Sequence, residues 1–264
     1  VYYKEKVEYF RQALDSIINQ TVKPNQIVII KDGKLTEQLN KTIEMYKNEY
    51  SQLIESYDIE KSNGLGNALK YGVKKCKYKY IARVDSDDIS LPYRFEKQVK
   101  YLMSNPDIDI LGGQIEEYDE NMKQRLLTRN VPLTQYDINE FIKYPSPFNH
   151  GTVLMKKEAV IKSGNYNNTQ FEDYDLWARM LIDNCKMANI DTVLCKNRTG
   201  KEFYKRRSGF KQVKRAIEIE RRLLKYKIID KRTYVKNIIF RTIFALTPAN
   251  AKKYLYKKYV RKEK

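Results

Sequence analysis

The segment Tyr80-Ile81-Ala82-Arg83-Val84-Asp85-Ser86-Asp87-Asp88 joins a short apolar stretch directly to three carboxylates. The apolar part predicts a buried strand, so the carboxylates are expected where that strand ends. Like charges this close repel one another unless a cation holds them together. Carboxylate oxygens favour Mg²⁺ or Mn²⁺, which keep open positions for substrate phosphates. The segment therefore indicates a metal site, with a solvated acidic turn as the alternative.

On the N-terminal side of this segment, predicted helices and strands alternate. In order they are a helix that ends before Pro24, a strand over Ile27–Ile30, a helix over residues 36–49, a strand near Leu53-Ile54 and a helix over Leu65–Cys76. This alternation predicts an α/β fold with parallel strands and crossover helices. Because such sheets bind ligands at the carboxyl ends of their strands, Asp32 joins the Asp85–Asp88 cluster as a candidate site residue.

On the C-terminal side, the pattern predicts a helix over residues 93–104, a strand over Ile108–Leu111 and hairpin-like sequence to about residue 130. The alternation then loosens. A second acidic cluster, Glu172-Asp173-Tyr174-Asp175-Leu176-Trp177, precedes an apolar helical face. It has two interpretations: an acidic helix N-terminus favoured by the helix dipole, or a carboxylate beside Trp177 that serves as a general base.

Composition sets limits on the class of protein. The chain has 264 residues, 42% of them hydrophobic, which supports one packed domain with an extension. Its three cysteines, Cys76, Cys185 and Cys195, have no metal-like or redox-like spacing, so a reducing compartment is expected. The sequence predicts neither a spanning helix nor a secretory signal. Because it begins at Val1 without Met, we expect that leading residues are missing.

The formal net charge of +18 lies entirely in the C-terminal part. Residues 1–196 contain 28 Lys and Arg and 28 Asp and Glu, whereas residues 197–264 contain 23 and 5, a difference of 18. The chain is therefore expected to be a neutral domain joined to a basic extension, a property that concerns partners rather than fold.

The basic extension is predicted to be helical over residues 210–262. Apolar side chains form a stripe that ends before Pro248: Val235, Ile238, Ile239, Phe240, Ile243, Phe244 and Leu246. An apolar stripe flanked by Lys and Arg suits a helix that lies on an anionic membrane surface. The alternative, of equal standing at this point, is that the stripe packs against the preceding domain.

The order and spacing of these pieces resemble family 2 of the glycosyltransferases, most closely the bacterial enzymes of O-antigen and exopolysaccharide synthesis. The resemblance covers about residues 1–200. Its matching pieces are Val1-Tyr2, Ile27–Gly33, Asn63–Gly72, Tyr80–Asp88, Asn149–Thr152 and Glu172–Trp177. The resemblance implies the GT-A fold, a Rossmann-like, mostly parallel mixed sheet flanked by helices. We expect a donor-binding half over residues 1–115, an acceptor half over residues 116–200 and the helical extension over residues 201–264.

Carried over residue by residue, the resemblance implies that Tyr2 and Asp32 frame the nucleobase, with Asp32 facing a uracil. Asp85 would approach the ribose, and Asp87, with Asp85 beside it, would hold Mn²⁺ or Mg²⁺ on the diphosphate. The donor-binding candidates are Val1, Tyr2, Asp32, Asn63, Gly64, Lys70, Asp85, Ser86, His150, Arg206 and Arg207. A lone histidine is more often a structural hydrogen-bonding residue than a ligand, so that role stays open for His150. The basic loop with Arg206 and Arg207 is equally open to being a solvated link.

Two departures from the family pattern leave the donor sugar open. The family often has two acidic residues before the glycine where this chain has Lys31-Asp32, and its Arg-Asn pair before Gly72 is replaced by Leu69-Lys70. A UDP-sugar is expected from the uracil-facing position of Asp32. Lys70 can still reach a phosphate.

The resemblance implies an inverting mechanism in which Asp173, flanked by Glu172, takes the proton of the acceptor hydroxyl. The expected acceptor is a saccharide linked to polyprenyl diphosphate, which places the enzyme in the cytoplasm, peripheral at the inner face of the bacterial plasma membrane. Two alternatives stay open. One is a nucleic-acid-binding protein, which the absence of a binding motif and the acidic clusters disfavour, so no nucleic-acid partner is expected. The other is a sugar nucleotidyltransferase, for which the glycine-rich loop is missing.

Overall fold

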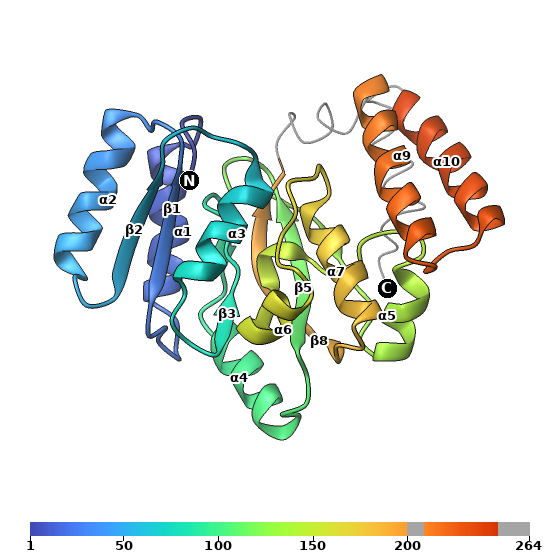
Figure 1. Cartoon of the computed structure of the whole chain (residues 1–264). Helices are drawn as coiled ribbons and strands as arrows, with labels where there is room; N and C mark the ends of the chain where they lie inside the picture. Colours follow the sequence, from blue (N-terminus) through green and yellow to red (C-terminus); the bar gives the residue numbers. More distant parts are fainter. Residues whose placement is uncertain (200–208, 248–264) are drawn as a thin grey trace.

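The computed structural model describes residues 1–199 and 209–247 as a mixed α/β domain that carries two C-terminal helices (Figure 1). Its helices are α1 Val7–Ile18, α2 Glu37–Glu49, α3 Leu65–Lys75, α4 Arg94–Ser104, α5 Gln135–Phe141, the 3-10 helix η1 His150–Thr152, α6 Lys157–Lys162, α7 Glu172–Ile182, α9 Phe210–Lys225 and α10 Lys231–Leu246. Its strands are β1 Ile27–Asp32, β2 Ile54–Ile59, β3 Tyr80–Ala82, β4 Ile89–Ser90, β5 Ile110–Tyr118, β6 Arg125–Arg129, β7 Leu154–Lys156 and β8 Met187–Arg198.

The N-terminal elements follow the sequence prediction closely. Strands β1 and β2 pair in parallel, with Ile27 opposite Ile54 and Asp32 opposite Ile59. The apolar face of α1 buries Phe10 and Leu14 against them, as a crossover layout requires. Asp32 therefore lies at the carboxyl end of β1, where the prediction put it.

The rest of the sheet differs from the expected, mostly parallel arrangement. Strand β3 pairs with β7 in antiparallel fashion, and the order continues through β5 and β8 to β4, with β6 beside β5. Among the described residues two strand pairs are parallel, β1–β2 and β5–β8, and four are antiparallel. The mixed α/β class is confirmed, but the parallel pairing is limited because β7, which sequence analysis did not identify, inserts between β3 and β5.

The C-terminal helices share the core of the domain rather than trailing from it. Ile219 and Leu223 of α9 are fully buried in the same cluster as Trp177 of α7 and Ile110 of β5. Figure 1 shows α9 beside α7, with α10 on the outer side of α9. The predicted domain boundary at residue 200 falls at the edge of the undescribed residues 200–208, so the division into domains stays a prediction. No helix in the described ranges has the length and apolarity needed to cross a bilayer.

Candidate active site

The first acidic cluster begins one residue after a buried arginine. The Arg83 side chain is only 9% exposed and forms an ion pair with Asp85. Its backbone N–H donates to the Val153 carbonyl (2.9 Å), and its own carbonyl accepts from the Arg94 guanidinium (2.8 Å). The backbone at Arg83 is therefore held by Val153 and Arg94, and the side chains of Arg83 and Asp85 point toward each other.

The last member of the cluster, Asp88, is an anchor. It is buried, and its oxygens accept hydrogen bonds from the Asn197 amide and from the Arg198 backbone N–H (2.8 Å), both on β8. Burial, followed by Asp85 and Asp87, raises its pKa well above the usual range. Because Arg198 also donates to the Asp87 carbonyl (2.6 Å), the end of β8 fixes the whole acidic turn. A solvated acidic turn is therefore excluded.

Asp87 is the carboxylate that most needs a cation. Burial, followed by the charges of Asp85 and Glu5, raises its pKa to about 6, against a smaller opposing effect of Arg83. Its neighbour Ser86 donates to Glu5 (2.5 Å), which adds another acidic group at the same point. No group of three or more His, Cys, Asp or Glu side chains in residues 1–199 and 209–247 is arranged to hold a metal by itself. Two carboxylates that lack a full protein cage suit Mg²⁺ or Mn²⁺ that takes further ligands from a substrate diphosphate.

The second cluster opens α7 with two carboxylates of raised pKa. Burial, followed by the charge of Asp173, raises the pKa of Glu172 to about 7. Burial also raises the pKa of Asp173, and the Tyr174 backbone N–H, Arg129 and Arg83 oppose it less strongly. A carboxyl group that titrates close to neutral pH is suited to accept a proton from a hydroxyl. An acidic N-terminus stabilised only by the helix dipole would be exposed, so the dipole alone does not account for this pair.

Arg83 connects the two clusters. Its charge lowers the pKa of Asp87 on one side and of Glu172 and Asp173 on the other, and Asp85 in turn raises the pKa of Glu172. Electrostatic effects of this kind are felt only over short distances inside a protein. Both clusters therefore lie within electrostatic range of Arg83, which supports the predicted common pocket. Sequence analysis missed Arg83; its signal is a lone cation in an apolar strand, two residues before Asp85 and so on the same side of an extended chain.

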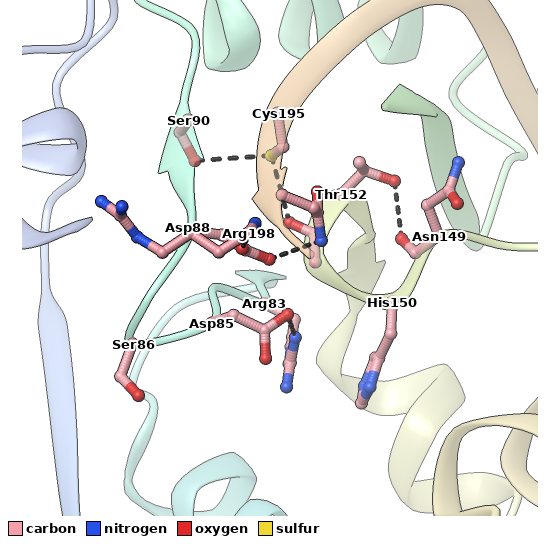
Figure 2. Close-up of polar contacts among 12 residues, drawn as sticks. Arg83, Asp85, Ser86, Asp88, Ser90, Asn149, His150, Thr152, Cys195 and Arg198 are labelled. Atoms are coloured by element: carbon pink, nitrogen blue, oxygen red, sulfur yellow. Dashed lines mark hydrogen bonds and ion pairs between the residues drawn. The ribbon is translucent and has the colours of Figure 1, made fainter. Parts of the chain in front are cut away.

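His150 lies beside Arg83 (Figure 2). Its Nε2 is 2.9 Å from the Tyr166 hydroxyl, and its ring is 5.8 Å from that of Trp177 in an edge-on contact. Burial, with a smaller contribution from Arg83, lowers its pKa well below the usual range, so the ring is neutral. The partners favour the structural interpretation of this histidine. Burial raises the pKa of Tyr166, which sequence analysis missed, and the charges of Asp173 and Glu172 add smaller increases against the opposing effect of Arg83.

The residue after His150 has to be glycine because of the acidic turn. A Cβ added at Gly151 would lie 2.9 Å from the Asp85 carboxylate oxygen and 3.8 Å from that of Asp88. This close approach brings η1 against the first cluster. The segment Asn149–Thr152 is thereby part of the site through its backbone rather than through a ligating side chain.

The expected nucleobase side lies at the end of β1. The Asp32 backbone N–H donates to the Val1 carbonyl (2.9 Å), and Tyr2 forms an isolated parallel bridge with Asp32. One carboxylate oxygen of Asp32 accepts from the Ser62 hydroxyl (3.0 Å), and the other is buried without a partner among the described residues. A buried acceptor of this kind suits the N–H of a nucleobase, because a buried oxygen that accepts no hydrogen bond costs free energy.

The start of α3 is packed against the loop that leads to the second cluster. Gly64 has a positive φ of 90°, and a Cβ there would lie 2.3 Å from the side-chain oxygen of Asn168. The Asn63 carbonyl accepts from the Asn67 amide (2.9 Å), and the Lys70 carbonyl accepts from the Asn165 amide (3.3 Å). Gly64 and Lys70 are thus in contact with the loop that precedes the second cluster. Arg206 and Arg207 lie outside the described residues.

The last carboxylate of the second cluster, Asp175, is a second anchor. It is fully buried, and one of its oxygens accepts from Asn167 (2.9 Å) and Arg179 (3.0 Å). The other accepts from Arg222 of α9 (3.2 Å) and from the hydroxyl of Tyr226 (3.0 Å), the residue that follows α9. Asp175 therefore ties α9 to the helix that carries Asp173. Sequence analysis did not single it out, since its partners on α9 lie far away in the chain.

The fold and the two acidic clusters that share Arg83 define the class of protein as a glycosyltransferase with the GT-A fold. The structure is similar to *S. aureus* TarS 1–349 in complex with UDP-GlcNAc, with a TM-score of 0.66 over 98% of this chain and 74% of that one at 15% identity. It is also similar to the mannosyltransferase PcManGT from Pyrobaculum calidifontis in complex with GDP-Man and Mn²⁺, with a TM-score of 0.63 over 97% and 73% at 13% identity. These likenesses establish the fold.

The profile of Glycosyl transferase family 2 matches residues 1–164, and the chain belongs to this family. It is 35% identical to the amylovoran biosynthesis glycosyltransferase AmsE of Erwinia amylovora, over 98% of this chain and 96% of the relative. It is also 35% identical to the UDP-Gal:alpha-D-GlcNAc-diphosphoundecaprenol beta-1,3-galactosyltransferase of Escherichia coli, over 99% and 94%. The predicted family and the enzymatic class are confirmed, and family 2 enzymes invert the transferred anomeric carbon.

Proposed function

We propose that this glycosyltransferase moves a sugar from a nucleoside-diphosphate sugar, a UDP-sugar before others, to a hydroxyl group of a saccharide in surface polysaccharide synthesis. The observation that carries the proposal is the position of Arg83, whose charge acts on the carboxylates of both clusters. A donor diphosphate at the first cluster and an acceptor hydroxyl at the second would then meet in one place.

On the donor side, the partnerless oxygen of Asp32 is proposed to accept from the uracil, with Val1 and Tyr2 beside the ring. Asp85 and Ser86 are proposed to approach the ribose. The phosphate side is assigned to Asn63, Gly64, Lys70, His150, Arg206 and Arg207. A neutral His150 can serve there as a hydrogen-bond partner but not as a cation.

Asp85 and Asp87 are the residues that would hold Mn²⁺ or Mg²⁺. When bound, the ion supplies Lewis-acid stabilisation of the negative charge that develops on the leaving diphosphate. The complex of PcManGT with GDP-Man and Mn²⁺ supports this choice of ion in a protein of the same fold. The protein's own contribution is Asp88, which fixes the turn so that the Asp87 carboxylate is held in place.

On the acceptor side, Asp173 is proposed to take the proton from the attacking hydroxyl, with Glu172 beside it. Burial raises the pKa of both groups, so each binds a proton more readily than an ordinary carboxylate. The hydroxyl oxygen then bonds to the anomeric carbon as the bond to the diphosphate breaks. A single displacement of this kind inverts the anomeric configuration.

The acceptor is proposed to be a saccharide linked to polyprenyl diphosphate. The Escherichia coli relative named for a GlcNAc-diphosphoundecaprenol acceptor matches 99% of this chain, including the C-terminal helices. We place the enzyme in the cytoplasm at the inner face of the bacterial plasma membrane, in contact with anionic lipid through its C-terminal segment. Nucleic acid is not among the proposed partners.

The decisive experiment is a panel of UDP- and GDP-sugars, with the thermal stabilisation of the full chain measured with and without Mn²⁺. We expect stabilisation by one UDP-sugar that depends on Mn²⁺ and that Asp87→Asn abolishes. Asp107→Asn, an exposed site with the same change of charge, is the matched control and should behave like the wild type. Stabilisation of the Asp87→Asn variant equal to that of the wild type would refute the donor assignment.

A further inference from the structure

The outermost helix, α10, has an unusual distribution of side chains. Its most buried residues are Asn237 (6% exposed) and the small Ala245 (3%). Five of its large apolar side chains are instead exposed by 48–63%: Val235, Ile239, Phe240, Ile243 and Leu246. This is the stripe for which sequence analysis left membrane contact and internal packing open. The structure shows that most of it does not pack against the domain.

A polar network holds α10 in this orientation. The Asn237 amide donates to the Lys143 carbonyl (2.8 Å) after α5 and to the fully buried Glu220 carboxylate (2.9 Å) of α9. Arg241 forms an ion pair with the same carboxylate (2.7 Å) and also donates to the Tyr144 carbonyl. Turning the helix to bury its apolar side would break these bonds and leave a buried charge without its partner, which is strongly unfavourable. The hydrogen bonds and the ion pair among Asn237, Arg241 and Glu220 therefore keep the apolar face of α10 directed outward.

Basic side chains border the apolar face at both ends. Lys231, Arg232 and Lys236 are exposed on the first two turns of α10. At the other end, the Gly209 backbone N–H donates to the Ala245 carbonyl (3.0 Å), which brings the start of α9 alongside. Phe210, the next residue, is 77% exposed at this end of α10, and the exposed Lys211 and Lys214 follow it.

We propose that the α10 face, defined as Val235, Ile239, Phe240, Ile243, Leu246 and Phe210 with this basic border, docks onto an anionic lipid bilayer surface. Apolar side chains can sink into the acyl boundary while the lysines and arginines meet the headgroups. Residues 209–247 contain 11 Lys and Arg and 3 Asp and Glu. Two copies joined through this face would bring like charges together, which disfavours a second copy of the chain as the occupant.

The inference deepens the proposed function, on which its biological purpose rests, by assigning the membrane contact to one face. Because Asn237 and Arg241 tie that face to the carbonyls that follow α5, and Asp175 ties α9 to α7, the bilayer plane would have a fixed orientation relative to Asp173. A flexible basic tail would give no such fixed orientation. The acceptor headgroup would thus be presented to the site at a constant height.

The test is sedimentation of the full chain with vesicles of phosphatidylcholine alone or mixed with phosphatidylglycerol. We expect binding to the mixed vesicles that falls as salt is raised, and at least a tenfold loss in the double variant Ile239→Asp, Ile243→Asp. The control is Val99→Asp, Met103→Asp on α4, because it makes the same change at two exposed apolar residues with the same spacing (37% and 79% exposed). The control should bind vesicles like the wild type.

Equal vesicle binding by the double variant and the wild type would overturn the inference, as would a wild type that does not bind the anionic vesicles. A dimer in light scattering that only the double variant dissociates would reassign the face to contact between copies. Metal-dependent donor binding, measured on the same variants, should be unchanged by either double substitution. If donor binding is absent from every protein while vesicle binding still distinguishes the variants, the proposed function fails and the docking surface stands.

Discussion

Two segments of this protein, Asp85–Asp88 and Glu172–Asp175, each place three carboxylates within four residues, and the structure divides both in the same way. In each, the last carboxylate accepts hydrogen bonds from a segment that comes later in the chain: β8 for Asp88, and α9 for Asp175. Of the earlier carboxylates, Asp87, Glu172 and Asp173 have raised pKa values, which the charge of Arg83 opposes. An acidic cluster here is thus an anchor joined to a reactive group.

The two anchors differ in how their charge is compensated. Asp175 forms ion pairs with Arg179 (3.0 Å) and Arg222 (3.2 Å), whereas Asp88 is held by a backbone N–H and an amide. Burial and like charges accordingly raise the pKa of Asp88 well above the usual range. Three carboxylates within four residues therefore produce, in one segment, an anchor that depends on its charge and, in the other, an anchor that does not. Substitutions at Asp88 and Asp175 should therefore differ in their effect on stability, and substitutions at Asp87 and Asp173 should change binding or turnover instead.

The largest effect is expected on turnover, for a substitution of the proposed reactive carboxylate Asp173. Asp173→Asn should lower kcat by about 10²–10⁴-fold, because the amide cannot accept the proton of the hydroxyl. Donor binding and folding should be retained, since Asp173 belongs to the acceptor side. Turnover and calorimetric titration with the donor sugar and Mn²⁺ would show this.

Asp87→Asn is the corresponding substitution in the first cluster. It should have the opposite effect, because donor binding is lost rather than the proton transfer from the acceptor. Should the two variants lose donor affinity equally, the assignment of one cluster to the donor and the other to the acceptor would be wrong.

The next effect concerns stability. Asp175→Asn should lower the free energy of unfolding by about 2–4 kcal/mol, because it removes the charged partner of two arginines at a fully buried position. Urea unfolding followed by circular dichroism measures it. Glu218→Gln is the control, since Glu218 pairs with the same Arg222 (3.2 Å) but is 46% exposed, where such pairs contribute about 1 kcal/mol or less. Equal losses in the two variants would contradict the anchoring role.

The parts of this design that sequence analysis predicted are local ones. The patterns for β1, α2, α3 and α4 lie within single elements, so the predicted positions agree with the structure to within one or two residues, whereas β2 extends five residues beyond the predicted Leu53-Ile54. The acidic clusters were visible because their carboxylates are adjacent in the chain. The placement of Asp32 at the end of β1 and of Asp85–Asp88 after β3 followed from the alternation of strand and helix.

What could not be predicted depends on contacts between distant segments. The insertion of β7 between β3 and β5 is decided by pairing across the sheet, and nothing within Leu154–Lys156 specifies its neighbours. Arg83, Tyr166 and both anchors matter because of partners elsewhere in the chain, such as Arg198 for Asp88. The exposure of the α10 stripe likewise depends on the Glu220 network, which no helical periodicity reveals.

A smaller effect should appear in the pH dependence of stability. The pKa of Glu172 is about 7 in the folded protein, above the ordinary value of 4.5, so the folded state holds more protons than the unfolded state between these pH values. Stability therefore falls as pH rises through this window, a loss that Glu172→Gln should relieve.

The advantage of the Glu172→Gln variant in unfolding free energy should grow from about zero at pH 4.5 to about 1–3 kcal/mol at pH 8. Thermal or urea unfolding across this range measures it. An advantage that does not change with pH would show that Glu172 is not the titrating group.

The smallest effect is expected for Asp88→Asn, and it separates the two anchors most directly. The new amide keeps one oxygen to accept from the Arg198 N–H, and it gains a donor facing Asn197. The side-chain oxygen of Asn197 is buried without a partner among the described residues, so turning its amide would supply the matching acceptor. Stability in urea at pH 7.5 should then change by less than about 1 kcal/mol, whereas Asp88→Ala, which strands the Arg198 N–H, should cost about 1–3 kcal/mol. A loss for Asp88→Asn as large as that for Asp175→Asn would mean that both anchors depend on their charge.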